Sequence, residues 1–144
     1  MYSIVVEGKP PSQQTKGKRK DSFQSKVRER FRHYNPDITI IDEDLYGIVI
    51  YFQQTRKDSN DPDADNISKP IWDSLIGECY NDDKVVRLRY AGVLTISPNT
   101  AFEITLNDLD DNISDDFDEL LSTGKSFVYI HIGILKSEHY KMKL

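Results

Sequence analysis

The sequence predicts an α+β protein: a mixed, mostly antiparallel sheet packed by two main helices, with an extra acidic helical segment near the C-terminus. Two observations support this prediction. Apolar residues alternate with other residues at both ends of the chain and in its middle, which is typical of strands. Between these segments apolar residues recur three or four positions apart, which is typical of helices. With 144 residues, 38% of them hydrophobic, we expect one domain over residues 1–144 with a single core.

The N-terminal part of the chain is predicted to form a strand, a loop and a helix. Tyr2–Glu7 has the composition of a strand, and residues 8–20 are rich in Pro, Gly and Lys, which predicts a mobile basic loop. Asp21 and Gln24 are spaced as in a capping box, which predicts that a short helix begins at Asp21. The apolar residues of this helix lie four positions apart, at Phe23, Val27 and Phe31.

The middle of the chain is predicted to form two strands, a helix and a third strand, over residues 38–41, 46–53, 67–79 and 85–94. The second of these strands has alternating apolar residues on one face, namely Ile48, Ile50 and Phe52. Pro70 is compatible with the first turn of the helix, and Trp72 is expected in the core. Cys79 is the only cysteine, which excludes an intramolecular disulfide, and we expect it to be a small core residue.

The last part of the chain is predicted to form a strand, a short helix and a long strand, over residues 101–106, 114–121 and 126–135. Ser114 is expected to cap the helix, which should end near Gly124. His131 lies on the face of the long strand opposite to its Val and Ile residues. A lone histidine on a strand is more often packed or hydrogen-bonded than catalytic, so we leave His131 out of the candidate site.

The net charge of −5 hides two zones of opposite charge. Residues 9–32 contain nine Lys or Arg and two acidic residues, giving +7, whereas residues 101–123 contain eight acidic residues and no Lys or Arg, giving −8. The basic zone is typical of binding to a phosphate backbone, and the acidic segment should face away from DNA or toward another partner. No apolar run is long enough to span a membrane and no signal peptide is evident, so an intracellular protein is expected.

Acidic residues gather between positions 58 and 83, in the order D-P-D-A-D-N-I-S-K-P and then N-D-D. Carboxylates this close together repel one another, and a hard cation such as Mg²⁺ offsets the repulsion through oxygen ligands. A calcium loop is excluded, because it requires glycine at Asn66 and a bidentate Glu at Trp72. Turn and cap chemistry explains a lone D-x-D but requires neither Lys69 nor the second acidic pair. The pattern therefore favours a metal-dependent site that cleaves phosphodiester bonds.

The same residues resemble the RusA family of Holliday junction resolvases. The pattern D-x-D-N-x-x-K, P-x-x-D-x-L and D-D-x-x-V is matched by Asp63, Asp65, Asn66, Lys69, Pro70, Asp73, Leu75, Asp82, Asp83 and Val86. The N-terminus is also similar, with a strand (Ser3–Val6) that runs into Gly8-Lys9-Pro10-Pro11. The resemblance covers residues 1–95 and implies a RusA-like fold.

The resemblance also implies a set of site residues. The catalytic residues would be Asp63, Asp65, Lys69 and Asp83. Their three carboxylates would bind Mg²⁺, with Mn²⁺ as a substitute, and the lysine would offset charge on the transition state. The spacing from Lys69 to the acidic pair is shorter than in the family pattern, which leaves both Asp82 and Asp83 as candidates for the third ligand. Asp61 and Asp82 are candidates for the outer shell of the metal.

By the same resemblance, the protein is expected to be a homodimer that resolves four-way DNA junctions by paired cuts, in a bacterial cytoplasm or encoded by a phage. Candidate DNA contacts are the cations Lys9, Lys16, Lys18, Arg19, Lys20, Lys26, Arg28, Arg30, Arg87 and Arg89. Two other functions stay open. One is a module that binds branched DNA without cleaving it. The other is a phage or mobile-element protein that uses the acidic segment 101–123 to bind a protein partner.

Overall fold

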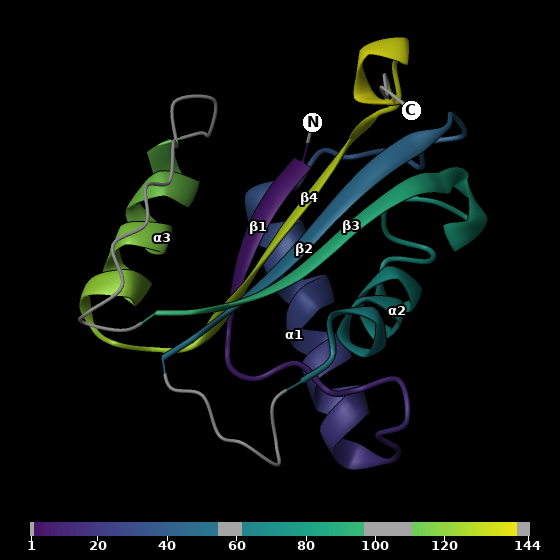
Figure 1. Ribbon diagram of the computed structural model, residues 1–144. Helices are drawn as coiled ribbons and strands as arrows, with labels where there is room; N and C mark the ends of the chain where they lie inside the picture. Colours follow the sequence, from purple (N-terminus) through teal and green to yellow (C-terminus); the bar gives the residue numbers. More distant parts are fainter. Residues whose placement is uncertain (1, 55–61, 97–110, 141–144) are drawn as a thin grey trace.

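The computed structural model describes residues 2–54, 62–96 and 111–140 (Figure 1). Its elements are, in order, β1 (Tyr2–Glu7), α1 (Lys18–Tyr34), β2 (Leu45–Gln53), α2 (Ala64–Ser74), the 3-10 helix η2 (Asp83–Val85), β3 (Val86–Thr95), α3 (Asp111–Ser122), β4 (Phe127–Ile134) and the 3-10 helix η3 (Ser137–Tyr140). Over these described ranges, no helix combines the length and the apolar character needed to cross a membrane.

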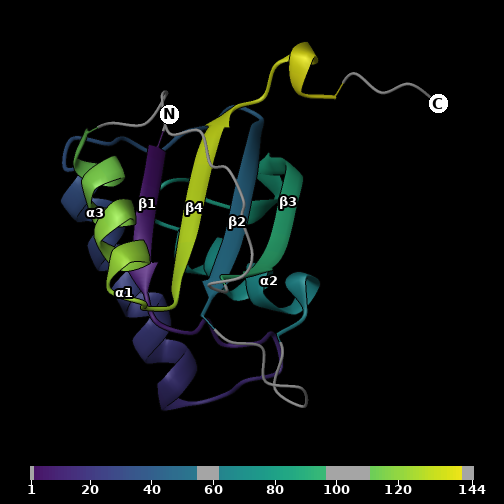
Figure 2. The ribbon, with the colours of Figure 1, turned by 60° about the vertical axis from the view of Figure 1, so that its left-hand side comes forward.

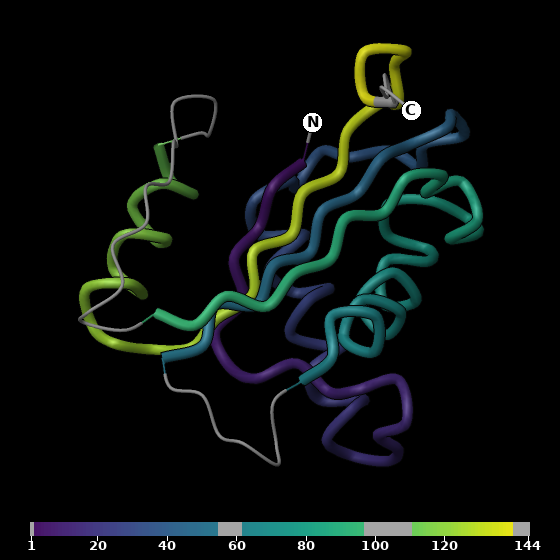
Figure 3. Tube along the Cα trace, viewed as in Figure 1, coloured from purple at the N-terminus to yellow at the C-terminus, as the bar shows by residue number. Residues whose placement is uncertain are grey.

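The four strands form one mixed sheet in the order β1-β4-β2-β3. β4 pairs antiparallel with both β1 and β2, whereas β2 and β3 are parallel. Helices α1 and α2 lie on one face of the sheet, and α3 lies on the other face beside β1 (Figure 2). A parallel pair needs a crossover connection, and α2 lies in the connection between β2 and β3 (Figure 3). The predicted α+β fold with a mixed, mostly antiparallel sheet is confirmed.

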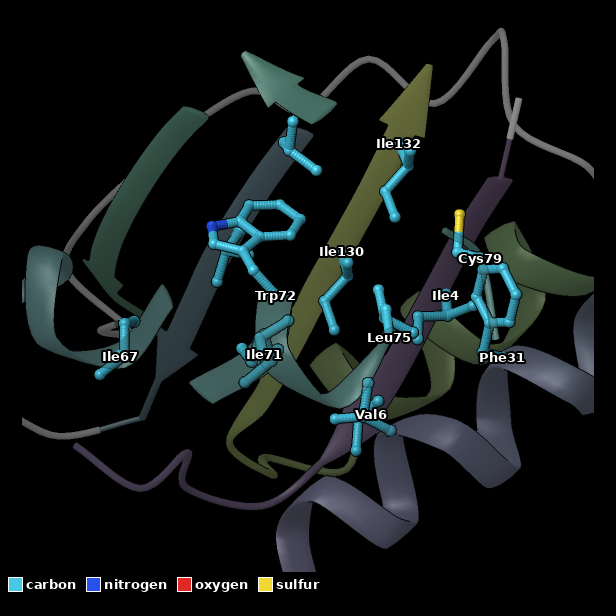
Figure 4. Packing of buried hydrophobic residues seen from close by; sticks show 14 of the residues in the cluster. Ile4, Val6, Phe31, Ile67, Ile71, Trp72, Leu75, Cys79, Ile130 and Ile132 are labelled. Atoms are coloured by element: carbon cyan, nitrogen blue, oxygen red, sulfur yellow. The ribbon is translucent and has the colours of Figure 1, made fainter. Parts of the chain in front are cut away.

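The main core lies between the sheet and helices α1 and α2 (Figure 4). The predicted apolar stripe of α1 is buried there, together with residues of α2 and of all four strands. Trp72 is fully buried and lies across β2 against Gly47. A Cβ at position 47 would stand 2.4 Å from Trp72 Cη2, so only glycine leaves room for the indole at this point.

Strand β2 is buried on both faces because it lies in the interior of the sheet. Val49 and Tyr51 belong to the main core, whereas Phe52 belongs to a second cluster with Phe117 of α3 and Phe127 of β4. The alternation predicted for this strand is therefore present, but its other face is buried as well.

Two predictions for the first 41 residues are wrong. Helix α1 begins at Lys18 and not at Asp21; it follows Gly17, which has a φ of 79°, and no side chain caps it. The strand predicted over residues 38–41 does not form. This segment instead packs against the main core, and the Ile41 N–H donates to the Cys79 carbonyl (2.8 Å).

Helix α2 begins earlier than predicted because Asp63 caps it. The Asp63 side chain accepts a hydrogen bond from the Asp65 N–H (3.0 Å), and the helix starts at Ala64. Pro70 therefore lies inside the helix and not in its first turn. At this interior position it removes one backbone hydrogen-bond donor of the helix. The helix is also shorter at its C-terminal end, and Cys79 lies in the turn beyond it, fully buried as expected.

Helix α3 begins at Asp111, so Ser114 lies within it and is not its cap. The helix ends as predicted near Gly124, which has a φ of 69°. The Gly124 N–H donates to the Leu121 carbonyl (3.3 Å) and the Lys125 N–H to the Leu120 carbonyl (3.1 Å), which is the pattern of a Schellman motif. The strand predicted over residues 101–106 lies outside the described residues.

Strand β4 matches its predicted range to within one residue at each end. The expectation for His131 is also confirmed, because both of its ring nitrogens have hydrogen-bond partners. His131 Nδ1 lies 2.6 Å from Ser3 Oγ, and Nε2 lies 3.0 Å from the Tyr46 hydroxyl.

Candidate active site

Lys69 is at the centre of the candidate site. It lies on α2 four residues after Asp65 and four before Asp73, so the three residues share one face of the helix. Its Nζ donates to Asp73 Oδ1 (2.8 Å) and to Asp83 Oδ2 (2.5 Å). Because Asp83 belongs to η2, this contact joins α2 to the segment that leads into β3. Two of the predicted site residues, Lys69 and Asp83, are thus in direct contact.

Asp83 has a second cationic partner, Arg89 of β3. Arg89 Nη2 donates to Asp83 Oδ2 (3.3 Å) and to the Asp83 backbone carbonyl (2.6 Å), and Arg89 Nε donates to the Val86 carbonyl (3.1 Å). The Asp83 side chain is 13% exposed. Asp82, in contrast, caps η2 by accepting from the Lys84 N–H (2.9 Å), and its side chain is 54% exposed. Of this acidic pair, Asp83 is the member that contacts the lysine of α2.

These contacts change the protonation equilibria of both groups. The hydrogen bonds to Asp73 and Asp83 raise the pKa of Lys69 above its usual value. Burial alone would raise the pKa of Asp83, but the hydrogen bonds and charges of Lys69 and Arg89 outweigh burial, and the pKa of Asp83 is lowered. At neutral pH the lysine is therefore an ammonium and the aspartate a carboxylate. Neither group is suited to accept a proton as a general base.

Asp63 and Asp65 lie at the N-terminus of α2, where Asp63 is the cap and Asp65 is in the first turn. Both residues are exposed. Negative charge is favourable at this end of a helix, because the helix dipole places partial positive charge there. Helix capping thus accounts for part of the acidic motif, while the side chain of Asp65 stays open to solvent and to a ligand.

The predicted metal ligands are not gathered into one cluster in this structure. Within residues 2–54, 62–96 and 111–140, no group of three or more His, Cys, Asp or Glu side chains is placed to hold a metal ion. Asp83 is turned to its two cations, whereas the Asp63 carboxylate is turned to its own helix. The assignment of Asp63, Asp65 and Asp83 to one ion stays a prediction, and Asp61 lies outside the described residues.

The basic zone is divided between a loop and a helix. Its N-terminal cations, here called the basic N-terminal group, lie just before α1 and in its first turn: Lys16, Lys18, Arg19 and Lys20. One turn further along α1, Gln24 Nε2 donates to the Pro70 carbonyl (2.9 Å), which joins α1 to α2 beside Lys69. The basic N-terminal group is therefore held close to the helix that carries the candidate site.

Several other predicted DNA contacts have partners within the protein. Arg30 Nη2 forms an ion pair with Asp116 Oδ2 of α3 (3.1 Å), and Lys26 Nζ donates to the Glu7 carbonyl (2.6 Å). Arg89 is bonded to Asp83, as described above. Arg28 of α1 also has a partner, because its Nη2 donates to Ser25 Oγ (3.3 Å). Lys9 follows β1, and Arg87 lies on β3.

Two contacts of this site were not predicted from the sequence. Asp73 is a partner of Lys69, and the four-residue spacing on one helix could have indicated it. The contact of Arg89 with Asp83 depends on the turn made by η2, which no sequence period reveals. Arg89 Cζ also lies 5.9 Å from the ring centre of Trp72, and the buried Nε1 of that indole has no hydrogen-bond partner among the described residues.

A comparison with models of protein families matches residues 7–105 to the family described as Endodeoxyribonuclease RusA. The matched segment is more than half of the chain and includes α1, α2, η2 and β3, with all the candidate catalytic residues. A search of curated proteins gave no match. The family match confirms the resemblance that the acidic motif indicated, and the chain belongs to the RusA family of endodeoxyribonucleases.

Proposed function

We propose that this protein is a Mg²⁺-dependent endonuclease that cleaves branched DNA, with the four-way junction as its preferred substrate. Membership of the RusA family supports the reaction class. The observation that carries the proposal is the contact of Lys69 Nζ with Asp83 Oδ2 (2.5 Å), one helical turn from the exposed Asp65. The ammonium of Lys69 and the carboxylate of Asp83 are thus held together near a further carboxylate that could bind a metal ion.

Asp63, Asp65 and Asp83 would hold the ion, because carboxylate oxygens are the ligands that Mg²⁺ takes in proteins. When bound, the ion would act as a Lewis acid toward the scissile phosphate. These residues fit the ion in their chemistry, since the first two are exposed and the lowered pKa of Asp83 keeps it ionised. Asp82 stays a candidate for the outer shell.

Lys69 would supply positive charge to the phosphate in the transition state. Its raised pKa keeps the ammonium protonated at neutral pH, so that it donates hydrogen bonds but does not accept a proton. An ammonium has three donors, and Asp73 and Asp83 each take one of them. The third donor is left for a phosphate oxygen of the substrate.

The basic N-terminal group would bind the phosphate backbone next to this site. Its members lie at the start of α1, which is joined to α2 through Gln24 and Pro70. Contacts from Lys and Arg to phosphate fix the position of DNA but do not read its bases. We therefore infer that the basic N-terminal group contributes to the affinity for DNA and not to the choice of its sequence.

The test is to map the cuts in an end-labelled four-way junction, a Y-fork and a plain duplex of equal length in Mg²⁺. We expect two nicks placed symmetrically across the branch point of the junction, as a homodimer with two sites would produce. Asp65→Asn should abolish cleavage but keep junction binding, because it removes a ligand and a charge near phosphate without shortening the side chain. Asp118→Asn is the matched control, because it removes an exposed carboxylate of α3 and should leave the cleavage rate unchanged.

Each outcome separates one part of the proposal from the others. If Asp65→Asn cuts at the wild-type rate, the assignment of the site is wrong. If plain duplex is cut as fast as the junction, the metal-dependent reaction is supported, but the protein is a non-specific nuclease. Tight junction binding without cleavage in either Mg²⁺ or Mn²⁺ would favour the alternative function, a module that binds branched DNA.

A further inference from the structure

Four charged side chains of alternating sign form a chain across α2, η2 and β3. In order they are Asp73, Lys69, Asp83 and Arg89, joined by contacts of 2.8, 2.5 and 3.3 Å. The two inner residues, Lys69 and Asp83, are candidate catalytic residues. The two outer residues, Asp73 and Arg89, each contact one of the inner residues.

Arg89 holds both the side chain and the backbone of Asp83. Its Nη2 donates to the carboxylate and to the backbone carbonyl of Asp83, while its Nε donates to the Val86 carbonyl. Because the guanidinium is planar and its donors point in fixed directions, these bonds fix the carboxylate relative to the start of β3. The guanidinium also lies over the ring of the fully buried Trp72, with Cζ 5.9 Å from the ring centre.

Asp73 holds the other inner residue. It is anchored on α2 one turn after Lys69, and its carboxylate accepts from Nζ at 2.8 Å. The Lys69 side chain is 40% exposed, so without a second partner its flexible stem would sample many positions. With Asp73 and Asp83 on two different elements, the ammonium is fixed between them.

We propose that Arg89 and Asp73 are positioning residues of the active site: Arg89 fixes the carboxylate of Asp83, and Asp73 fixes the ammonium of Lys69. The inference rests on the function proposed above. It also replaces the expectation that Arg89 binds DNA phosphate, because Nε and Nη2 of this arginine already donate to acceptors within the protein.

The first test is single-turnover cleavage of a four-way junction at saturating protein and Mg²⁺. Arg89→Gln should cut about 10- to 100-fold more slowly, which is the usual effect of removing a partner that orients a ligand. Arg89→Lys should be slowed to a similar extent, because one ammonium cannot reproduce the fixed fork of a guanidinium. Asp73→Asn should also be slowed, because the amide does not keep the charge that holds Lys69.

The second test is junction binding in EDTA, which requires no cleavage. If Arg89 is a positioning residue, Arg89→Gln should bind with an unchanged dissociation constant and an unchanged dependence on salt. If Arg89 instead binds phosphate, the log–log slope should fall by about 0.9 and Arg89→Lys should restore it, which would overturn the proposal. Lys125→Gln is the matched control: it breaks the ion pair with Glu7, also at 3.3 Å, and should change neither the binding nor the rate.

The third test measures the contact itself by thermal unfolding. The Tm shifts of Arg89→Gln and Asp83→Asn should not add in the double variant, whereas those of Lys125→Gln and Asp83→Asn should add. Additive shifts for Arg89 and Asp83 would overturn the proposal even if cleavage is slowed. If the wild-type protein cuts no junction, the proposed function fails, and this measurement still decides whether Arg89 holds Asp83.

Discussion

Replacing Gly47 by Ala should destabilise the protein and disturb the active site together, because β2 leaves no room for a side chain at this position. A Cβ there would lie 2.4 and 2.8 Å from Cη2 and Cζ3 of Trp72, and 3.0 Å from Cγ1 of Val86. Trp72 is fully buried in the main core, so the strand or the indole must shift. Val86 begins β3 and accepts a bond from Arg89, so a shift on this side would also displace the residues around Asp83.

The expected loss of stability is the balance of two effects. Inserting a methyl group into a filled core costs about 1–3 kcal/mol, and a contact of 2.4 Å with a buried ring favours the upper part of that range. Replacing glycine also lowers the entropy of the unfolded chain, which returns about 0.4–1 kcal/mol. The net loss is about 1–2.5 kcal/mol. For a chain of this length the Tm should therefore fall by about 3–8 °C.

The assay is thermal unfolding followed by circular dichroism, together with junction cleavage by the same preparation. Gly92→Ala is the matched control, because Gly92 lies on the neighbouring strand β3 and a Cβ there meets nothing within 4 Å. It should leave the Tm unchanged or raise it slightly. A wild-type Tm for Gly47→Ala, or an equal loss for Gly92→Ala, would refute the conclusion that the indole decides this position.

Three further predictions follow from the charged residues. Folding lowers the pKa of Asp83 from its usual value of 3.8 and raises the pKa of Lys69 from its usual value of 10.5. The contact between them should therefore stabilise the fold fully between pH 3.8 and pH 10.5. This stability should be lost as the pH falls through the lowered pKa of Asp83 or rises through the raised pKa of Lys69. With Lys69 40% exposed, Asp83→Asn should cost about 1 kcal/mol or less within that window, and an equal loss at pH 2 would contradict this account. Replacing the basic N-terminal group by Ala should lower the log–log salt slope of junction binding by about 3–4, whereas an unchanged slope would place the DNA contacts elsewhere. Asp116→Asn should remove the ion pair of Arg30 but leave its bonds to the Val5 carbonyl and the Tyr34 hydroxyl. The salt slope should rise by up to about 0.9 if Arg30 then reaches phosphate, and an unaltered slope would keep Arg30 out of the DNA interface.

Strands β1, β2 and β4 were predictable from sequence because their burial follows their apolar pattern, whereas β3 has the composition of a strand but only Val86 buried. All four begin and end within one residue of the predicted ranges. Helix starts were less predictable. Helix α1 begins after Gly17 without a side-chain cap, and the first turn of α2 has Asp and Asn residues that are equally typical of a loop. The segment 38–41 has β-branched residues, but its backbone bonds to the turn at Cys79 and not to a strand.

The contact between two residues of the candidate site was predictable from the motif, whereas their other partners were not. Motif spacing places Lys69 and Asp83 in one pattern, and the structure brings them to 2.5 Å. Their other contacts depend on tertiary structure: the turn of η2 sets the distance between Asp83 and Arg89. Internal ion pairs likewise decide which cations of the basic zone are open to DNA, as Arg30 shows. Counting charges along the chain cannot make that distinction.

The position of the site depends on a strand that lies outside the segment matched to the family. Residues 7–105 include β2 and β3 but only the last residue of β1 and none of β4. In the sheet, β4 lies between β1 and β2 and pairs with both along their lengths. β2 in turn pairs with β3, and these two strands flank α2 in the sequence and support the contact between Lys69 and Asp83. The matched segment therefore contains the candidate site residues, while the C-terminal segment supplies the strand that joins β1 to β2, the strand that precedes α2.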